Sequence, residues 1–130
     1  IGEGETFLTE KDYPRAESFF HSLTNSPEAD LAAAAWAGEG AAIFESTAEA
    51  KDLTDLRRAQ ISLAHAAVLD SGAGEASAKA NYYLGQCLLA LGPDHEGDNF
   101  KTRARDYFQI VASHYPTSKW AGLAKVALTQ

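Results

Sequence analysis

The 130-residue chain lacks methionine, has one cysteine, and contains no apolar run long enough to cross a membrane. A transmembrane helix needs roughly 20 consecutive apolar residues. The longest near-uniform stretch, 31–44, is interrupted by Gly38, Glu39 and Gly40. We therefore expect no direct insertion into a membrane.

The single Cys87 excludes an internal disulfide and a zinc site built from several cysteines.

An excess of basic residues is also missing. The formal net charge is −7 and the pI is about 4.9, so no overall positive field attracts nucleic acid. One basic cluster, Lys101, Arg103 and Arg105, falls at an expected helix start, where acidic residues of the 93–99 segment can compensate its charge. We expect no nucleic-acid partner.

The motifs of common catalytic sites are absent as well. The histidines lie in four separate segments, and the sequence has no glycine-rich phosphate loop, serine elbow or paired-carboxylate motif. Cys87 lies among leucines, which is typical of a small buried hydrophobic residue. We predict a chain that is not an enzyme and has no cofactor, no catalytic residue and no metal site.

The segment 93–99 keeps one alternative open. It concentrates Asp94, His95, Glu96 and Asp98, whose oxygen donors could hold a divalent cation. It lacks the twelve-residue calcium-loop pattern and its terminal glutamate. We interpret it as a solvated insertion, with ion binding as the alternative.

The hydrophobic pattern predicts an all-α fold. Apolar residues recur at three- and four-residue spacing, and no alternating stretch is bounded by hairpin turns. Capping signals mark helix starts at Ser26-Pro27-Glu28 and at Asp52 or Thr54. The predicted helices are about 1–10, 12–24, 28–45, 53–70, 75–91, 99–115 and 117–129.

Residues 1–130 fit one domain, since 45% are hydrophobic and 22% are charged. The chain begins at Ile1, without an initiator residue or the pattern of a signal peptide. We expect a processed chain or a fragment of a larger protein.

Three segments share one spacing of small and large apolar residues: Ala16-Phe20-Leu23, Ala59-Leu63-Ala66 and Ala104-Phe108-Val111. Offsets of four and seven place the residues of each segment on one helix face, where alanine allows close approach and the larger side chain fills the space beside it. A second series pairs an apolar residue with a very small one: Ala37-Gly38, Leu84-Gly85 and Leu123-Ala124. Both series favour antiparallel helix pairs.

The best copy, NYYLGQCLLALG followed by ARDYFQIVASHYP, resembles the tetratricopeptide repeat family. The matching positions are Leu84, Gly85, Ala104, Phe108, Val111 and Pro116, after which Trp120 and Leu123 begin a further repeat. The resemblance implies a right-handed solenoid of antiparallel helix pairs, with about three pairs and a closing helix. The units are stretched, because Ala16, Ala59 and Ala104 are 43 and 45 residues apart against about 34 for the family. We place the extra residues at 46–53, 71–75 and 92–99.

The ending YFQIVASHYPTSKWAGLAKVAL is also similar to the bacterial repeats of outer-membrane assembly lipoproteins and periplasmic coordinating proteins. This similarity implies the bacterial periplasm or cell envelope as the location. The cytoplasm is the alternative.

The family resemblance implies a non-catalytic protein-interaction module or scaffold that binds a peptide or helix of another protein in a concave groove. Carried over from the family pattern, the groove residues are Glu39, Ile43, Lys79, Tyr82, Gln86, Leu89, Lys125 and Leu128, with Ala42 and Ala121 beside them. Tyr82 keeps a second interpretation, which is packing between repeats. The alternative function is a structural subunit that docks through the solenoid ends or the outer face in a larger assembly.

The proposed repeat register predicts that Phe108→Ala lowers the free energy of unfolding by about 3–5 kcal/mol, because it empties a packed position between helices. Denaturant unfolding measures the change. A loss below about 1 kcal/mol would contradict the register.

Overall fold

The computed structural model describes residues 2–47, 52–69, 74–91 and 100–129. These ranges contain seven helices and no strand: α1 (Gly2–Thr9), α2 (Tyr13–Leu23), α3 (Ala29–Thr47), α4 (Leu53–Leu69), α5 (Glu75–Ala90), α6 (Phe100–His114) and α7 (Lys119–Leu128). The predicted all-α class is confirmed, and the predicted helix ends agree to within about two residues. Of the expected insertions, residues 48–51 and 71–73 and all of 92–99 with its candidate ion ligands lie outside the described residues.

Local side-chain hydrogen bonds set the helix starts. The backbone N–H of Asp55 donates to Oδ1 of Asp52 at 3.1 Å, so Asp52 caps α4 as predicted. The N–H of Ala121 donates to Oγ of Ser118 at 3.2 Å at the start of α7. Because such caps depend on a few neighbouring residues, the sequence can locate the helix boundaries.

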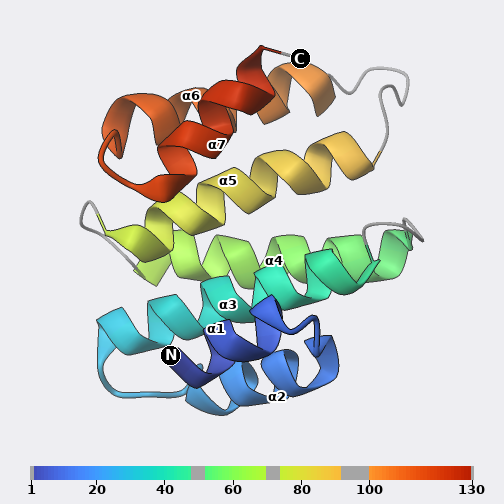
Figure 1. The fold of residues 1–130 in the computed structure, drawn as a ribbon, viewed down its shortest axis with the longest axis vertical. Coiled ribbons are helices and arrows are strands. Elements are labelled where there is room, and N and C mark those ends of the chain that lie inside the picture. The colour runs from blue at the N-terminus through green and yellow to red at the C-terminus, as the bar shows by residue number, and fades with distance from the viewer. Residues whose placement is uncertain (1, 48–51, 70–73, 92–99, 130) are drawn as a thin grey trace.

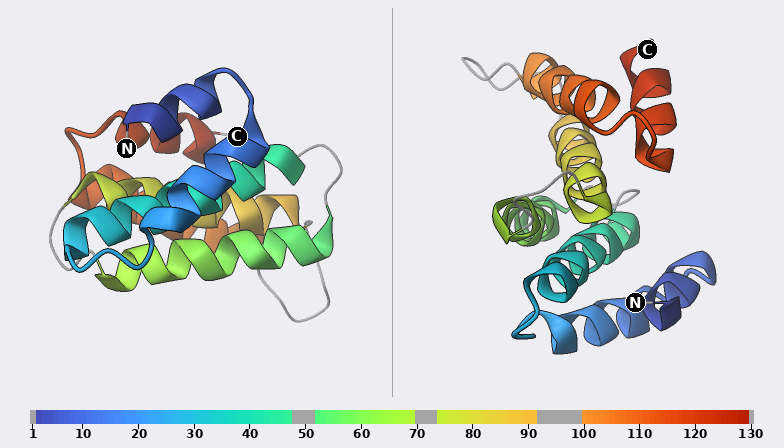
Figure 2. Two further views of the ribbon diagram at one scale, coloured as in Figure 1. Left: turned by 90° about the horizontal axis from the view of Figure 1, so that it is seen from below. Right: turned by 90° about the vertical axis from the view of Figure 1, so that its left-hand side faces the viewer.

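The helices stack along the long axis of the molecule, with α1 and α2 at one end, α3, α4 and α5 in the middle, and α6 and α7 at the other end (Figure 1). Each helix packs on the next one, and α1, α3, α5 and α7 also pack on their odd-numbered neighbours. Among the described residues, the even-numbered helices α2, α4 and α6 do not pack on one another. The stack is therefore curved, with α1 and α7 projecting to one side and α4 to the opposite side (Figure 2). We call the surface formed by α1, α3, α5 and α7 the inner face.

A glycine on an odd helix receives a large side chain from the following even helix in all three pairs. The contacts are Gly4 with Phe20, Gly40 with Leu63, and Gly85 with Phe108, where an added Cβ would come within 2.4, 2.6 and 2.6 Å. The three large side chains belong to the predicted stripes, and each is at most 1% exposed. These contacts bring the two helices of a pair close together, because glycine has no side chain to separate them.

The middle unit differs in register from the sequence prediction. Gly38, which the prediction aligned with Gly85, faces Phe20 of the preceding helix α2. Gly40, two residues later, contacts Leu63 of the following helix α4. Glycine occurs twice on α3 because this helix packs closely on both of its neighbours in the chain.

The hydrophobic core extends along the stack. One cluster surrounds Phe20 between α2 and α3, a second surrounds Leu63 between α3, α4 and α5, and a third surrounds Phe108 between α5, α6 and α7. Each helix pair thus shares its apolar surface with the next pair, so stability depends on stacking.

Gly85→Ala is expected to lower the free energy of unfolding by about 1–2 kcal/mol, since crowding at Phe108 outweighs the gain in helix propensity. Gly122→Ala is the matched control, because an added Cβ there meets no atom within 4 Å. The control should stabilise by about 0.5–1 kcal/mol. Urea unfolding measures both changes, and equal effects of the two substitutions would contradict the packing described.

A candidate binding site on the inner face

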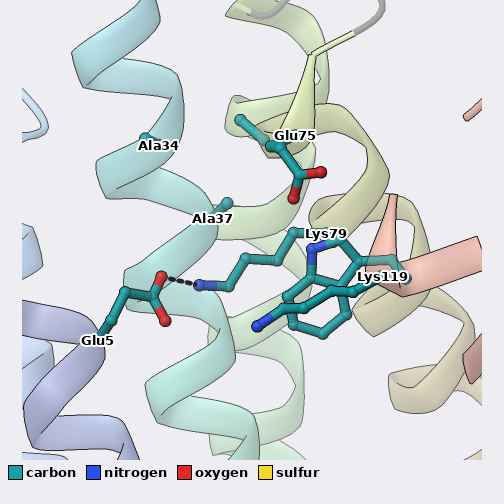
Figure 3. Close-up of a pocket in the computed structure, with 8 residues that line it drawn as sticks. Glu5, Ala34, Ala37, Glu75, Lys79 and Lys119 are labelled. Atoms are coloured by element: carbon teal, nitrogen blue, oxygen red, sulfur yellow. Dashed lines mark hydrogen bonds and ion pairs between the residues drawn. The ribbon is translucent and has the colours of Figure 1, made fainter. Parts of the chain in front are cut away.

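The inner face contains a cavity of about 150 Å³ bounded by all four odd-numbered helices. Its lining residues are Glu5 from α1, Ala34 and Ala37 from α3, Glu75, Ala76 and Lys79 from α5, and Lys119 and Trp120 from α7. The alanines keep the space open because their side chains are short. The two lysine side chains both extend toward Glu5 (Figure 3).

Lys79 is the central polar group of this site. Its side chain is 8% exposed, and its Nζ lies 2.9 Å from Oε1 of Glu5. The same ammonium lies 5.6 Å from the ring centroid of Phe20 and 5.8 Å from that of Trp120. A buried cation without a partner costs several kcal/mol, so the carboxylate and the two ring faces stabilise it together. Lys79 thus connects α5 to α1, α2 and α7.

A second cavity, of about 290 Å³, adjoins the first one at the Glu5–Lys79 ion pair. It shares Glu5, Lys79, Lys119 and Trp120 with the first cavity and adds residues from the α1–α2 segment and from α3 and α5: Leu8, Thr9, Lys11, Tyr13, Glu45 and Tyr83. The ion pair therefore lies where the two cavities meet.

Tyr83 supplies a fixed donor at the second cavity. Its hydroxyl donates to Oε1 of Glu45 at 3.1 Å. Burial, followed by the charge of Glu45, raises the pKa of Tyr83 well above its ordinary value. The phenol keeps its proton, and the carboxylate of Glu45 is held against α5.

Aromatic rings form the wall of the site at α7. The ring of Trp120 lies 5.5 Å from that of Tyr82 and 5.6 Å from that of Tyr83, and Tyr82 lies 5.8 Å from Phe108. Gln86 donates to the hydroxyl of Tyr82 at 2.6 Å. The structure thus places Tyr82 in the packing between α5, α6 and α7, with Gln86 bonded to its hydroxyl. Neither residue lines the two cavities.

Glu39 and Ile43, two of the predicted groove residues, lie away from the inner cavities. Glu39 faces α2, where His21 Nδ1 lies 3.2 Å from its carboxylate, and its side chain is 9% exposed. Ile43 is 2% exposed and belongs to the core cluster around Leu63. Glu39 points away from the cavities because the helix turns by about 200° between Ala37, which lines the first cavity, and Glu39.

The remaining predicted residues are scattered over the surface of α5 and α7. Leu89 is 42% exposed, Lys125 is exposed, and Leu128 is half-buried against the Phe108 cluster. None of them lines the two inner cavities. Lys79 is the one of the eight predicted residues that lines the two inner cavities, and it lines both of them.

Sequence reasoning did not assign Glu5, Glu75, Lys119 or Trp120 to the groove. Trp120 carried a usable signal, because the tetratricopeptide pattern that the sequence resembles has a tryptophan at this position. Glu5 carried none, because its partner Lys79 is 74 residues away in the chain.

Within the described residues, Cys87 supplies no reactive thiol to this site. Burial raises the pKa of Cys87 to about 12, so its thiol is protonated and unreactive. No group of three metal-ligating side chains occurs in the part of the chain that the structure describes. Within the same part, none of the helices combines the length and the apolar character that crossing a membrane requires.

No protein-family model, curated protein or solved structure matches the chain. The function must therefore be inferred from the geometry of the inner face and from the sequence pattern.

The two partners of the ion pair are expected to respond differently to neutralisation. Glu5→Gln should lower the free energy of unfolding by about 1–2 kcal/mol, because it leaves the buried Lys79 ammonium without an anion while solvent screens part of the effect. Lys79→Met should change it by less than about 1 kcal/mol, because the apolar chain fills the same space and Glu5 can turn to water.

Urea unfolding at neutral pH measures both changes. Glu3→Gln is the control for Glu5→Gln, since Glu3 is an exposed acid on the same helix. A larger loss for Lys79→Met than for Glu5→Gln would contradict the burial of the ammonium.

Proposed function

We propose that the chain is a non-catalytic protein-interaction module, built as a tetratricopeptide-like right-handed solenoid, whose inner face binds a peptide segment or helix of another protein. The observation that carries the proposal is the pair of adjoining cavities bounded by the odd-numbered helices. A stacked array that curves toward one side offers such a surface to an extended ligand. The resemblance to envelope-type repeats extends the proposal to a role in the bacterial periplasm or cell envelope.

The chemistry of the lining suits a protein ligand. Lys79 and Lys119 offer charged donors, Glu75 offers an acceptor, and Trp120 offers an apolar and cation-binding surface. The repeated contacts of Gly4, Gly40 and Gly85 with the following helix support the solenoid assignment, because they give every helix pair the same close approach.

A second candidate function is supported by the outer face of α4. Leu53, Ile61 and Val68 are 56%, 60% and 80% exposed. Their spacing places them within one stripe, together with the exposed Ala64. A subunit docked through this stripe in a larger assembly would cover it.

Filling the inner cavity tests the proposed function without assuming the charge of the ligand. Dodecapeptides selected from a random display library against the wild-type protein serve as ligands. Ala34→Phe places a ring in the cavity of about 150 Å³ and should weaken their binding at least about tenfold, because ring and peptide compete for the same space. Fluorescence anisotropy with labelled peptides measures the dissociation constants.

Ala64→Phe is the matched control, because it adds the same group on the outer face of α4. It should leave peptide binding within about twofold. Binding that is lost with Ala64→Phe and retained with Ala34→Phe would transfer the interaction to the outer face. Circular dichroism confirms that both variants fold.

A further inference from the structure

We infer that the Glu5 carboxylate holds the place of an acidic side chain from the partner, which displaces Glu5 from Lys79 when the segment binds. This inference rests on the proposed function and names the ligand chemistry of the same site. The occupant is an aspartate or glutamate side chain within a peptide segment.

The charge of the ligand follows from the burial of Lys79. Its ammonium carries three donor protons and lies in a site where its side chain is 8% exposed. A ligand that separated Lys79 from Glu5 without supplying another anion would leave a buried cation unpaired, which is strongly unfavourable. A carboxylate can make the exchange, because it replaces one charge-assisted hydrogen bond with another.

The two members of the ion pair differ in their freedom to leave. The Glu5 side chain is 44% exposed and belongs to α1, whereas Lys79 is held within the stack on α5. Once a ligand carboxylate pairs with Lys79, Glu5 can therefore rotate into water at small cost, while the ammonium keeps its position. The exposed partner is the one that a ligand replaces.

Replacing Glu5 at Lys79 would also change the space that is available to a ligand. The cavities of about 150 and 290 Å³ are both lined by Glu5 and Lys79. Moving the Glu5 side chain away from Lys79 would therefore free space in both cavities beside the ammonium.

Besides the ion pair, two cations, Lys119 and Lys11, and two acids, Glu75 and Glu45, line the cavities. Lys119 lines both cavities with its Nζ 4.7 Å from the ring centroid of Trp120, and Lys11 lines the larger cavity. Glu45, an acid of the larger cavity, accepts the hydrogen bond of Tyr83. A ligand carboxylate on Lys79 would thus have Lys119 available for its second oxygen.

A fluorescence titration tests the exchange. In a Trp36→Phe background Trp120 is the remaining tryptophan, and it lines the cavity. The ligands are the dodecapeptides selected by display against the wild-type protein, synthesised with amidated C-termini so that acidic side chains supply their carboxylates. Changes in Trp120 emission report the dissociation constant of each peptide.

Glu5→Gln should tighten the binding of acidic peptides at least about fivefold, because it removes the competing carboxylate. Glu3→Gln removes the same charge from the same helix without touching Lys79, and should change binding less than about twofold. Replacing the acidic residues of a peptide by their amides should weaken its binding to the wild-type protein at least about tenfold.

Lys79→Met provides a second test, which does not depend on how well Glu5→Gln folds. In Lys79→Met, acidic peptides and their amide counterparts should have equal dissociation constants. Circular dichroism checks that the variant folds. Weaker or unchanged binding to folded Glu5→Gln, or indifference to the acid-to-amide exchange, would overturn the inference. Binding that requires a free C-terminal carboxylate would overturn the assignment to side chains.

The outcomes separate this inference from the proposed function. Peptides that Ala34→Phe blocks but that are indifferent to Glu5→Gln and Lys79→Met would leave the inner face as a binding site and overturn the acidic ligand alone. If no selected peptide is blocked by Ala34→Phe, both are overturned.

Discussion

A lysine ammonium placed inside a helical stack constrains the elements around it. Lys79 projects from α5 into the inner face, where burial makes an unpaired charge costly. Glu5 from α1 supplies the anion, and Phe20 from α2 and Trp120 from α7 supply aromatic ring faces. The first and last helices thus meet the middle of the chain at one charged group. The two inner cavities adjoin this group, so the arrangement that stabilises the fold also defines the candidate site.

The curved stack around this group is built from one contact used three times. A glycine on an odd helix receives Phe20, Leu63 or Phe108 from the next helix, and the odd helices also pack on one another. The sequence could predict the helices and the three buried stripes, because capping groups and residues spaced by three and four act within one helix. It misaligned the middle unit because both Gly38 and Gly40 are available on α3, and only the packing of α4 distinguishes them.

The candidate site was less accessible to sequence reasoning. Glu5 and Lys79 are 74 residues apart, and nothing in the local pattern of either residue indicates the other. Glu39 was assigned to the groove from a family pattern, but its helix turns it toward His21 on α2. A pattern of apolar spacing indicates which face of a helix is buried more firmly than which polar side chains meet across helices. Lys79, which the sequence pattern around Gly85 placed among the expected groove residues, lines both inner cavities.

The central claim is that Glu5 and Lys79 interact directly across the inner face. A double-mutant cycle tests it most directly, with unfolding free energies measured for the wild-type protein, Glu5→Gln, Lys79→Met and the double variant. The cycle isolates the interaction between the two side chains from their separate effects on packing. The structure predicts a favourable interaction energy of about 1 kcal/mol or more, reduced at high salt. An interaction energy near zero, unchanged by salt, would contradict the contact and the account built on it.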